Sequence, residues 1–227
     1  MKKVFIAGAL IVAMAASATA QDKSVSFGVR AGANLSTQRV NYDDMPSDAN
    51  DDVGFGLGFH VGAVVDINFA NYFYFTPGLL FTTKGYKSEG DDYKSTLNLY
   101  YLDVPLMVSF GYPVTDDFKL KASVGPVLGV GLFGSEKWEY TYNGQTEKGT
   151  NKDGIFSSGT NDEGEYTADY NRFNLGLGFG ISGEFKQFSL GVNYNLGLLN
   201  VAHIEGDNDN NYSIKNHSIT ISLGYNF

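Results

Sequence analysis

The sequence contains no cysteine, one tryptophan and three histidines. Without cysteine, a disulfide framework, a thiolate metal site and a lipid-modified cysteine are all excluded. Acidic residues outnumber basic ones, and the net charge of −9 argues against nucleic-acid binding, which depends on Lys and Arg neutralising phosphates. No apolar run reaches the roughly 20 residues that a transmembrane helix needs. These absences leave a chain rich in glycine and aromatic residues, which favours β-structure.

The first twenty residues have the pattern of an export signal. Two lysines at positions 2 and 3 precede a thirteen-residue apolar run, residues 4–16, and Ala18-Thr19-Ala20 supplies the small residues that signal peptidase requires. We therefore predict that residues 1–20 are cleaved before Gln21. Loss of the two lysines takes the net charge from −9 to −11, and residues 21–227 are short enough to form one all-β domain.

Eight later segments alternate between apolar and polar residues with a period of two. Strand side chains point alternately to the two faces of a sheet, so each segment has one apolar face and one polar face. Three of the segments contain an internal proline, Pro77, Pro105 or Pro126, and we expect a local bulge at each. The segments are residues 25–36, 55–67, 73–81, 100–110, 118–132, 173–185, 188–198 and 219–227.

The placement of charge and glycine distinguishes a membrane barrel from a soluble β-sandwich. The apolar faces of the eight segments carry no charged residue, as expected if they contact lipid, where a charge costs about 2–4 kcal/mol. Glycine falls on the polar faces, with Gly183 as the exception. Small inward residues suit an eight-stranded barrel, because its interior has little room. The charged residues of the polar faces are Arg30, Asp66, Lys84, Asp103, Lys119, Lys121 and Glu184.

The connections between the segments are alternately short and mostly longer. Transmembrane barrels have short periplasmic turns and longer external loops, and an even strand count places both termini on the periplasmic side. The sequence thus predicts an all-β, eight-stranded antiparallel up-and-down transmembrane β-barrel in the outer membrane. The longer connections are residues 37–53, 88–96, 135–171 and 201–216.

Several segments resemble the outer-membrane β-barrel domain proteins of Bacteroidota-type Gram-negative bacteria, often called the porin family. The resemblance implies a small OmpA-like or OmpX-like barrel of the cell envelope, and it implies no particular activity. It also implies that Leu223, Tyr225 and Phe227 form the terminal signal that the barrel-assembly machinery binds. The resemblance is carried by FTPGLLFTTKG (75–85), YLDVPLMVSF (101–110), NLGLGFGISGEF (174–185), FSLGVNYNLGLLNV (188–201) and ITISLGYNF (219–227).

The sequence gives little sign of catalysis. His60 is expected to point into the barrel near the middle of its strand, six residues before inward-facing Asp66 and too far from it for direct contact. We expect His60 to be a hydrogen-bonded lumen residue and the protein to have no enzymatic activity and no cofactor. A lipid-modifying barrel enzyme stays open as the third alternative.

Four charged residues are expected near the periplasmic end of the lumen: Asp66, Lys119, Lys121 and Glu184. Two acids and two bases in so narrow a barrel would neutralise one another and block passage. The leading hypothesis is therefore a structural or surface-interaction barrel with a plugged lumen. A narrow channel for small solutes or protons is the alternative.

The expected external loops are strongly acidic, holding 19 of the 25 acidic residues against six Lys or Arg. This charge would suit divalent-cation bridging to lipopolysaccharide phosphates, or a basic partner. Asp207, Asp209 and Asn211 have the spacing of the first calcium-loop ligands. However, Tyr212 and Ser218 replace the glycine and glutamate that such a loop requires, so we predict no metal site.

Loop 135–171 is the expected recognition surface. Long loops are commonly functional or disordered, and exposed aromatics are common binding anchors. Because three aromatics alternate at its start, a hairpin is expected to extend beyond the membrane; two of them could instead belong to the aromatic girdle at the membrane surface. We expect a monomer that contacts outer-membrane lipid and lipopolysaccharide, with a possible extracellular ligand or protein bound to this loop. The candidate residues are Trp138, Tyr140, Tyr142, Phe156 and Tyr166.

Overall fold

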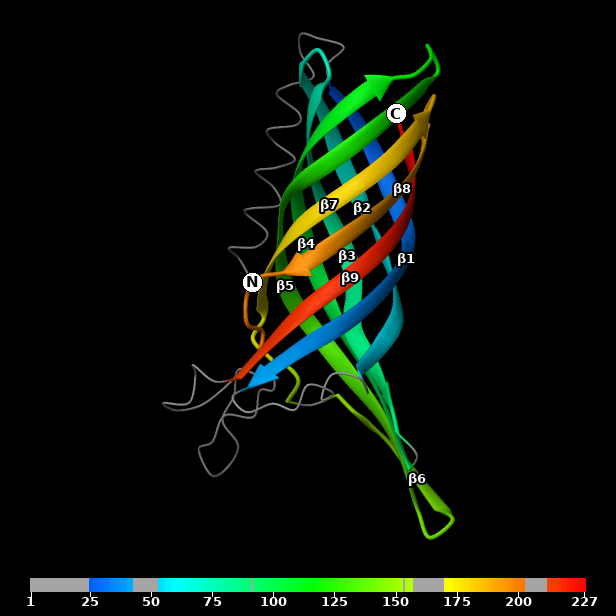
Figure 1. Cartoon of the computed structure of the whole chain (residues 1–227), viewed down its shortest axis with the longest axis vertical. Coiled ribbons are helices and arrows are strands. Elements are labelled where there is room, and N and C mark those ends of the chain that lie inside the picture. The colour runs from blue at the N-terminus through cyan, green and yellow to red at the C-terminus, as the bar shows by residue number, and fades with distance from the viewer. Residues whose placement is uncertain (1–24, 43–52, 91, 153, 157–169, 203–211) are drawn as a thin grey trace.

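The described part of the chain folds into nine antiparallel strands (Figure 1). The computed structural model describes residues 25–42, 53–90, 92–152, 154–156, 170–202 and 212–227, so the predicted signal segment 1–20 lies outside the described residues. In the described part no helix is both long and apolar enough to cross a membrane. The strands are β1 (Val25–Tyr42), β2 (Val53–Ala70), β3 (Phe73–Glu89), β4 (Tyr93–Pro113), β5 (Phe118–Tyr142), β6 (Gln145–Asn151), β7 (Phe173–Phe185), β8 (Phe188–Gly197) and β9 (Tyr212–Asn226).

Eight of the nine strands close into a ring. The sheet order is β4-β3-β2-β1-β9-β8-β7-β5, and β4 also pairs with β5, which joins the two ends. The eight predicted segments are the strands of this ring, so the barrel prediction is confirmed. The additional strand, β6, pairs only with the far part of β5, from Glu136 to Tyr142, and is not part of the ring. It lies within the predicted long loop.

The two ends of the barrel differ (Figure 1). At one end, here called the turn end, short turns join β2 to β3, β4 to β5 and β7 to β8. At the other, the loop end, β5 and β6 project beyond the ring as a hairpin. The hairpin turns at Asn143 and Gly144, whose φ angles are 49° and 75°. Positive φ at both central residues is typical of the tight turn that matches the twist of two strands.

The expected bulges at the three prolines are wrong. Pro77 pairs with Leu106, Pro105 with Val127 and Pro126 with Leu177, and the register is the same on both sides of each proline. Each strand has a neighbour on both sides, so the remaining hydrogen bonds hold the register although proline cannot donate one. The register shifts lie elsewhere, between Phe55 and His60, between Asn68 and Ala70, and between Tyr100 and Tyr101.

The outward faces of the ring are apolar and exposed, as predicted. Leu57, Ile181 and Leu223 are 74%, 70% and 65% exposed. Such side chains match a lipid environment, whereas in water so much exposed apolar surface would promote association. Polar side chains such as Asn34 and His60 are instead buried inside the ring.

The interior has two parts, which the alternation did not predict. Near the turn end it is polar, but near the loop end it contains a cluster of buried apolar side chains, here called the hydrophobic cap. Leu97, Leu99 and Tyr101 belong to this cap although they share the inward column of β4 with Asp103. The cap consists of Leu97, Leu99, Tyr101, Ile155, Phe156, Tyr170, Val201, Ala202 and Ile214.

A buried ion pair lies beneath the cap. Lys84 Nζ on β3 is 2.9 Å from Asp103 Oδ1 on β4, and the two side chains are 5% and 6% exposed. The ammonium also lies 4.6 Å from the centre of the Tyr101 ring. A Cβ on Gly129 would come within 2.6 Å of Asp103 Oδ1, so glycine leaves the space that the carboxylate occupies.

Removing one partner of this pair should destabilise the barrel strongly. We expect Lys84→Met to lower the free energy of unfolding by about 3–5 kcal/mol, because Asp103 would remain as an unpaired buried charge. The double variant Lys84→Met/Asp103→Leu should recover most of that loss. Urea unfolding of the refolded barrel in detergent micelles measures both.

The matched control is Lys186→Gln, which breaks the exposed Lys186–Asp117 pair at the turn end. We expect it to cost less than about 1 kcal/mol, as is usual for surface pairs. Equal losses in the Lys84 and Lys186 variants would contradict a stabilising role for the buried pair.

Candidate functional site

The cap is completed by two loop residues that insert into the ring. Ile155 and Phe156 are 2% and 4% exposed. A Cβ on Gly131 would lie 2.6 Å from the Phe156 ring, and one on Gly134 would lie 2.5 Å from Ile155 Cγ2. These two glycines of β5 therefore make the space that the two side chains fill. The Phe156 ring also packs edge-on against the Tyr101 ring, with 5.6 Å between centroids.

Hydrogen bonds from residues just before β7 hold this insertion in place. Arg172 Nη1 donates to the carbonyl oxygens of Gly131 and Leu132, each at 3.0 Å, and Arg172 Nη2 donates to the carbonyl of Phe156. The Tyr170 amide donates to the carbonyl of Ile155 at 3.0 Å, and its hydroxyl donates to Gln38 Oε1 of β1. Hydrogen bonds from Tyr170 and Arg172 thus attach this loop to β1 and to β5. In the sheet order these two strands are separated by β9, β8 and β7.

Burial corrects one of the candidate recognition residues. Phe156 was expected on the exposed loop surface, but it lies inside the barrel mouth, so it cannot anchor an external partner. The physical reason is that the lumen at the loop end is apolar and offers an aromatic ring a better environment than water. Tyr166 lies outside the described residues.

The three other candidates lie together on the β5–β6 hairpin. Trp138, Tyr140 and Tyr142 are 41%, 50% and 66% exposed, and their alternation places them on one face. The Trp138 indole lies over Gly149 of β6, where a Cβ would collide with the ring. Tyr140 pairs across the sheet with Tyr93 of β4, which is also exposed. This face therefore presents four aromatic side chains beyond the eight-stranded barrel: Tyr93, Trp138, Tyr140 and Tyr142.

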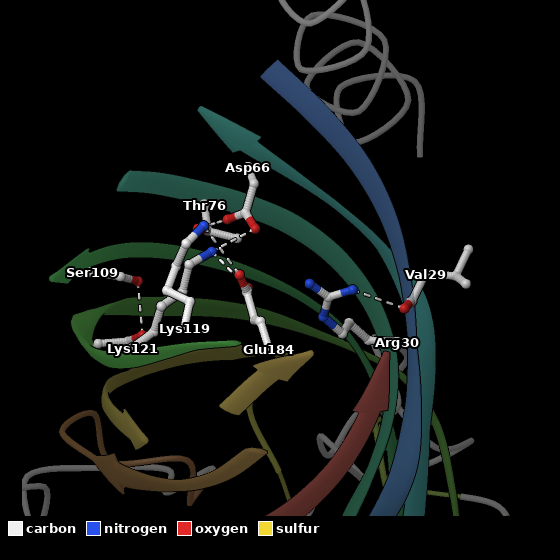
Figure 2. Close-up of polar contacts among 9 residues, drawn as sticks. Val29, Arg30, Asp66, Thr76, Ser109, Lys119, Lys121 and Glu184 are labelled. Carbon is white, nitrogen blue, oxygen red and sulfur yellow. Dashed lines mark hydrogen bonds and ion pairs between the residues drawn. The ribbon is translucent and has the colours of Figure 1, made fainter. Parts of the chain in front are cut away.

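At the turn end, the structure brings together the four charged residues singled out from the sequence (Figure 2). Here they are called the charged cluster: Asp66, Lys119, Lys121 and Glu184. Lys121 Nζ is 2.8 Å from Asp66 Oδ2 and 2.7 Å from Glu184 Oε1, while Lys119 Nζ is 3.6 Å from Glu184 Oε2. Three of these side chains are almost completely buried, and Lys119 is about one-third exposed at 31%.

Neighbouring groups complete the charged cluster. The Tyr74 ring lies 4.6 Å from Lys119 Nζ and 4.3 Å from Lys121 Nζ, and Thr76 donates its hydroxyl hydrogen to Asp66 Oδ1. Every member therefore has a partner of opposite charge, and the two ammonium groups also contact an aromatic face. Side chains from β2, β3, β5 and β7 therefore meet inside the lumen near the turn end.

A cavity of about 150 Å³ remains between the cap and the charged cluster. Its wall carries Arg30, His60, Ser182, Ser189 and Ser222 among other residues. A wider mouth of about 790 Å³ opens at the turn end, where Asn226 and members of the charged cluster line it. In the described part of the chain no three His, Asp or Glu side chains are grouped as metal ligands would be.

His60 is held in one orientation by Asn34 and Ser222. Its Nδ1 is 2.6 Å from Asn34 Oδ1, and its Nε2 contacts Ser222 Oγ. Asn34 Nδ2 donates to the carbonyls of Phe59 and Thr83, which leaves Oδ1 as the acceptor for Nδ1–H. Nε2 is then the acceptor for the Ser222 hydroxyl. The prediction of a hydrogen-bonded lumen histidine is confirmed.

Ser222, His60 and Asn34 form a hydrogen-bonded chain of serine, histidine and amide. In some enzymes a chain of this kind activates the serine as a nucleophile. Here His60 is 3% exposed, and Ser222 belongs to the inward column of β9. The chain of hydrogen bonds is therefore enclosed by the lumen and cannot reach lipid on the outer surface of the barrel.

Leu223 and Tyr225 lie on the outward face of β9, and Phe227 directly follows this strand. Leu223 and Phe227 are 65% and 74% exposed, and Tyr225 packs between Phe188 and Phe227 at 5.2 Å from each ring. The Phe227 amide donates to the carbonyl of Phe27 at 2.7 Å. The end of the chain is therefore paired with β1 while its side chain stays accessible.

Sequence reasoning missed the cap, although the chain carried a signal for it. Leu97, Leu99 and Tyr101 are apolar at inward positions, and Ile155-Phe156 is an apolar pair within a polar loop. Neither segment indicates by itself that the two meet, because their contact depends on ring closure. Arg30 was identified as an inward charge, but its isolation from the charged cluster was not anticipated.

Comparison with known proteins agrees with this architecture. A family model described as an outer membrane protein beta-barrel domain matches residues 19–203. The chain matches no curated protein.

Among solved structures, the attachment invasion locus protein Ail of Yersinia pestis shares 15% identity, with 90% of this chain and 99% of that chain covered and a TM-score of 0.38. Neisserial surface protein A shares 13%, covering 90% and 100%, with a TM-score of 0.42. OprG from Pseudomonas aeruginosa shares 12%, covering 90% and 97%, also with a TM-score of 0.42. Because the family model spans most of its length, this chain belongs to the outer membrane protein β-barrel domain family.

Proposed function

We propose that this outer-membrane barrel is a structural and surface-interaction protein with a plugged lumen and no enzymatic activity. The observation that carries this proposal is the insertion of Ile155 and Phe156 into the loop end of the ring. An open pore has no need of a loop that fills its mouth with buried apolar side chains. The charged cluster adds a second obstruction near the turn end.

The proposal includes the setting of the barrel. Residues 1–20 act as an export signal and are removed, both ends of the mature chain face the periplasm, and the loop end faces the exterior. This orientation is supported by the short turns at one end and the projecting hairpin at the other. We place the protein in a Bacteroidota-type envelope as a monomer surrounded by lipid and lipopolysaccharide, on the resemblance stated above.

A narrow channel for small solutes is the second candidate, and the cavity of about 150 Å³ is the observation in its favour. A lipid-modifying enzyme is the third candidate. The orientation of Ser222 towards the lumen argues against it, because a membrane lipid would have to enter the ring to meet that hydroxyl.

The purified barrel in planar lipid bilayers should show no stable conductance. Under this proposal the cap blocks the loop end, and an ion crossing the lumen would have to displace the buried ion pairs of the charged cluster. Single-channel recording on wild-type protein, with a known porin as the positive control, measures this. Reproducible large unitary steps from correctly folded barrel would contradict the plugged lumen and favour the channel.

The aromatic face of the hairpin, formed by Trp138, Tyr140 and Tyr142, is the proposed recognition surface. Exposed aromatics are frequent anchors in interfaces because they bury much area with little loss of conformational entropy. The acidic residues of the predicted external loops would suit a partner with basic groups or bridging divalent cations. The Asp207, Asp209 and Asn211 spacing considered for calcium lies outside the described residues.

The absence of cysteine makes the orientation of this surface directly testable. Gly144→Cys, in the open turn of the hairpin, should react with a membrane-impermeant maleimide on intact cells. Gln187→Cys, in the β7–β8 turn, should react only after the outer membrane is permeabilised. The reverse pattern of labelling would overturn the proposed orientation and with it the recognition surface.

We also propose that Leu223, Tyr225 and Phe227 are bound by the barrel-assembly machinery during insertion. Deletion of Phe227 should reduce the heat-modifiable, folded form in the outer-membrane fraction several-fold. Phe185→Ala is the matched control, because Phe185 is 54% exposed on the same outward surface but lies in an internal strand. Equal amounts of folded barrel in the Phe227 deletion and in wild type would refute a terminal signal.

A further inference from the structure

Arg30 is a charged lumen residue with no carboxylate within ion-pair distance among the described residues, although it lies close enough to Asp66 and Glu184 to be attracted by both. It lies on the inward column of β1, and Figure 2 shows its guanidinium directed into the lumen, apart from the charged cluster. Its one hydrogen bond within the described part is from Nη1 to the carbonyl of Val29, at 3.0 Å. A guanidinium carries five N–H donors, so most of its capacity is unused.

The charges around Arg30 do not balance. Three cations, Arg30, Lys119 and Lys121, face two carboxylates, Asp66 and Glu184, in this part of the lumen. Both carboxylates already bind lysine, so among these five side chains one positive charge has no matching negative charge. The Lys84–Asp103 pair is neutral by itself and does not alter this excess. Arg30 is only partly exposed and has no carboxylate within ion-pair distance in the described part of the chain, which favours a counter-ion beside it.

The walls beside Arg30 are shaped around the guanidinium. A Cβ on Gly28 of β1 or on Gly224 of β9 would come within 2.6 Å of Arg30 Nη1, so these two glycines leave the space that the guanidinium occupies. Ser189 Oγ borders the Gly224 position, and Asn226 Oδ1 borders the Gly28 position. A hydroxyl and an amide therefore flank the guanidinium on its two sides.

Asn226 supplies a second, independent observation. Its Oδ1 is enclosed and has no hydrogen-bond partner in the described part of the chain. An amide turned by half a rotation presents its NH₂ group at the same place, so Asn226 can donate to an anion bound by Arg30. The turn-end mouth of about 790 Å³ includes Asn226, and the adjoining cavity of about 150 Å³ includes Arg30 and Ser189.

We propose that Arg30, Ser189 and Asn226 form a binding site for a small oxyanion, a phosphate or a carboxylate, which enters through the turn end. The planar fork of a guanidinium matches the paired oxygens of such anions and binds them with charge-assisted hydrogen bonds. The hydrophobic cap closes the other end, so the anion leaves by the mouth through which it enters. The size of the cavity favours a free anion over a lipid phosphate.

The test uses the full-length mature barrel, refolded in uncharged detergent, with inorganic phosphate and acetate as probes at constant ionic strength in chloride. Isothermal titration should show saturable binding of at least one of them. Arg30→Gln should weaken that binding at least about tenfold, the effect expected from losing one or more charge-assisted hydrogen bonds. Ser189→Ala should weaken it less, by about threefold, because a neutral donor contributes less.

Arg39→Gln is the matched control. Arg39 lies on the same strand near the loop end, is exposed, and should leave binding unchanged. Heat-modifiable gel migration establishes that each variant is folded; if Arg30→Gln does not fold, Arg30→Lys, which keeps the charge but loses the fork, should weaken binding about fivefold.

A short-chain phosphatidic acid distinguishes the two sources of phosphate. We expect it not to compete with the free anion. If it does compete, the ligand of the site would be a lipid headgroup and not a free anion, which would overturn that part of the proposal. Absence of saturable binding by both probes, or equal binding in wild type and the Arg30 variant, would overturn the whole site. Neither result depends on conductance, so failure of this site and failure of the plugged lumen are distinguishable.

Discussion

The pairing of β4 with β5 is the contact on which the rest of the barrel depends. In the hydrocarbon of a membrane, an unpaired backbone N–H or C=O costs several kcal/mol, so a sheet can span it only when no edge remains. The β4–β5 ladder runs from Tyr93 with Tyr140 to Pro113 with Lys119 and removes both edges at once. It extends further than the ring itself, since its far part continues into the β5–β6 hairpin. The strand that closes the ring with β4 is thus also the strand that carries the projecting hairpin.

Closure with eight strands also determines what the lumen can contain. The interior is narrow, so each bulky inward side chain requires a small one opposite or beside it. Gly131 and Gly134 face the inserted Phe156 and Ile155, Gly129 faces Asp103, and Gly224 faces Arg30. These four inward glycines are therefore complements of particular side chains, whereas at others, such as Gly62 and Gly125, a Cβ would meet the backbone of the neighbouring strand. This explains why they are concentrated on the polar faces while the outward faces have almost none.

The two ends of the lumen are filled by different kinds of interaction. At the loop end, apolar side chains from β4, β9 and two loops exclude water; at the turn end, ion pairs link β2, β5 and β7. Apolar side chains can pack in many relative orientations. The charged groups of a buried ion pair must instead lie at definite positions, and loss of one partner leaves an unpaired buried charge. The cavity between them is the part of the lumen where water or a small anion has room. Under the proposals made above, the hairpin binds external partners, and the cavity reached from the turn end binds the small anion.

The sequence by itself determined the ring of eight strands, their register of inward and outward faces, and the positions of the charged inward residues. It could do so because alternation and glycine placement are local properties that each strand shows independently. Only the tertiary structure decided that Phe156 is a plug instead of an exposed anchor, that the prolines keep a regular register, and that Arg30 stands apart from the charged cluster. Each of these depends on contacts between segments far apart in the chain, such as Phe156 with Tyr101 and Arg30 with Gly224. A periodic pattern says which face a side chain occupies; closure of the ring decides which side chain it meets there.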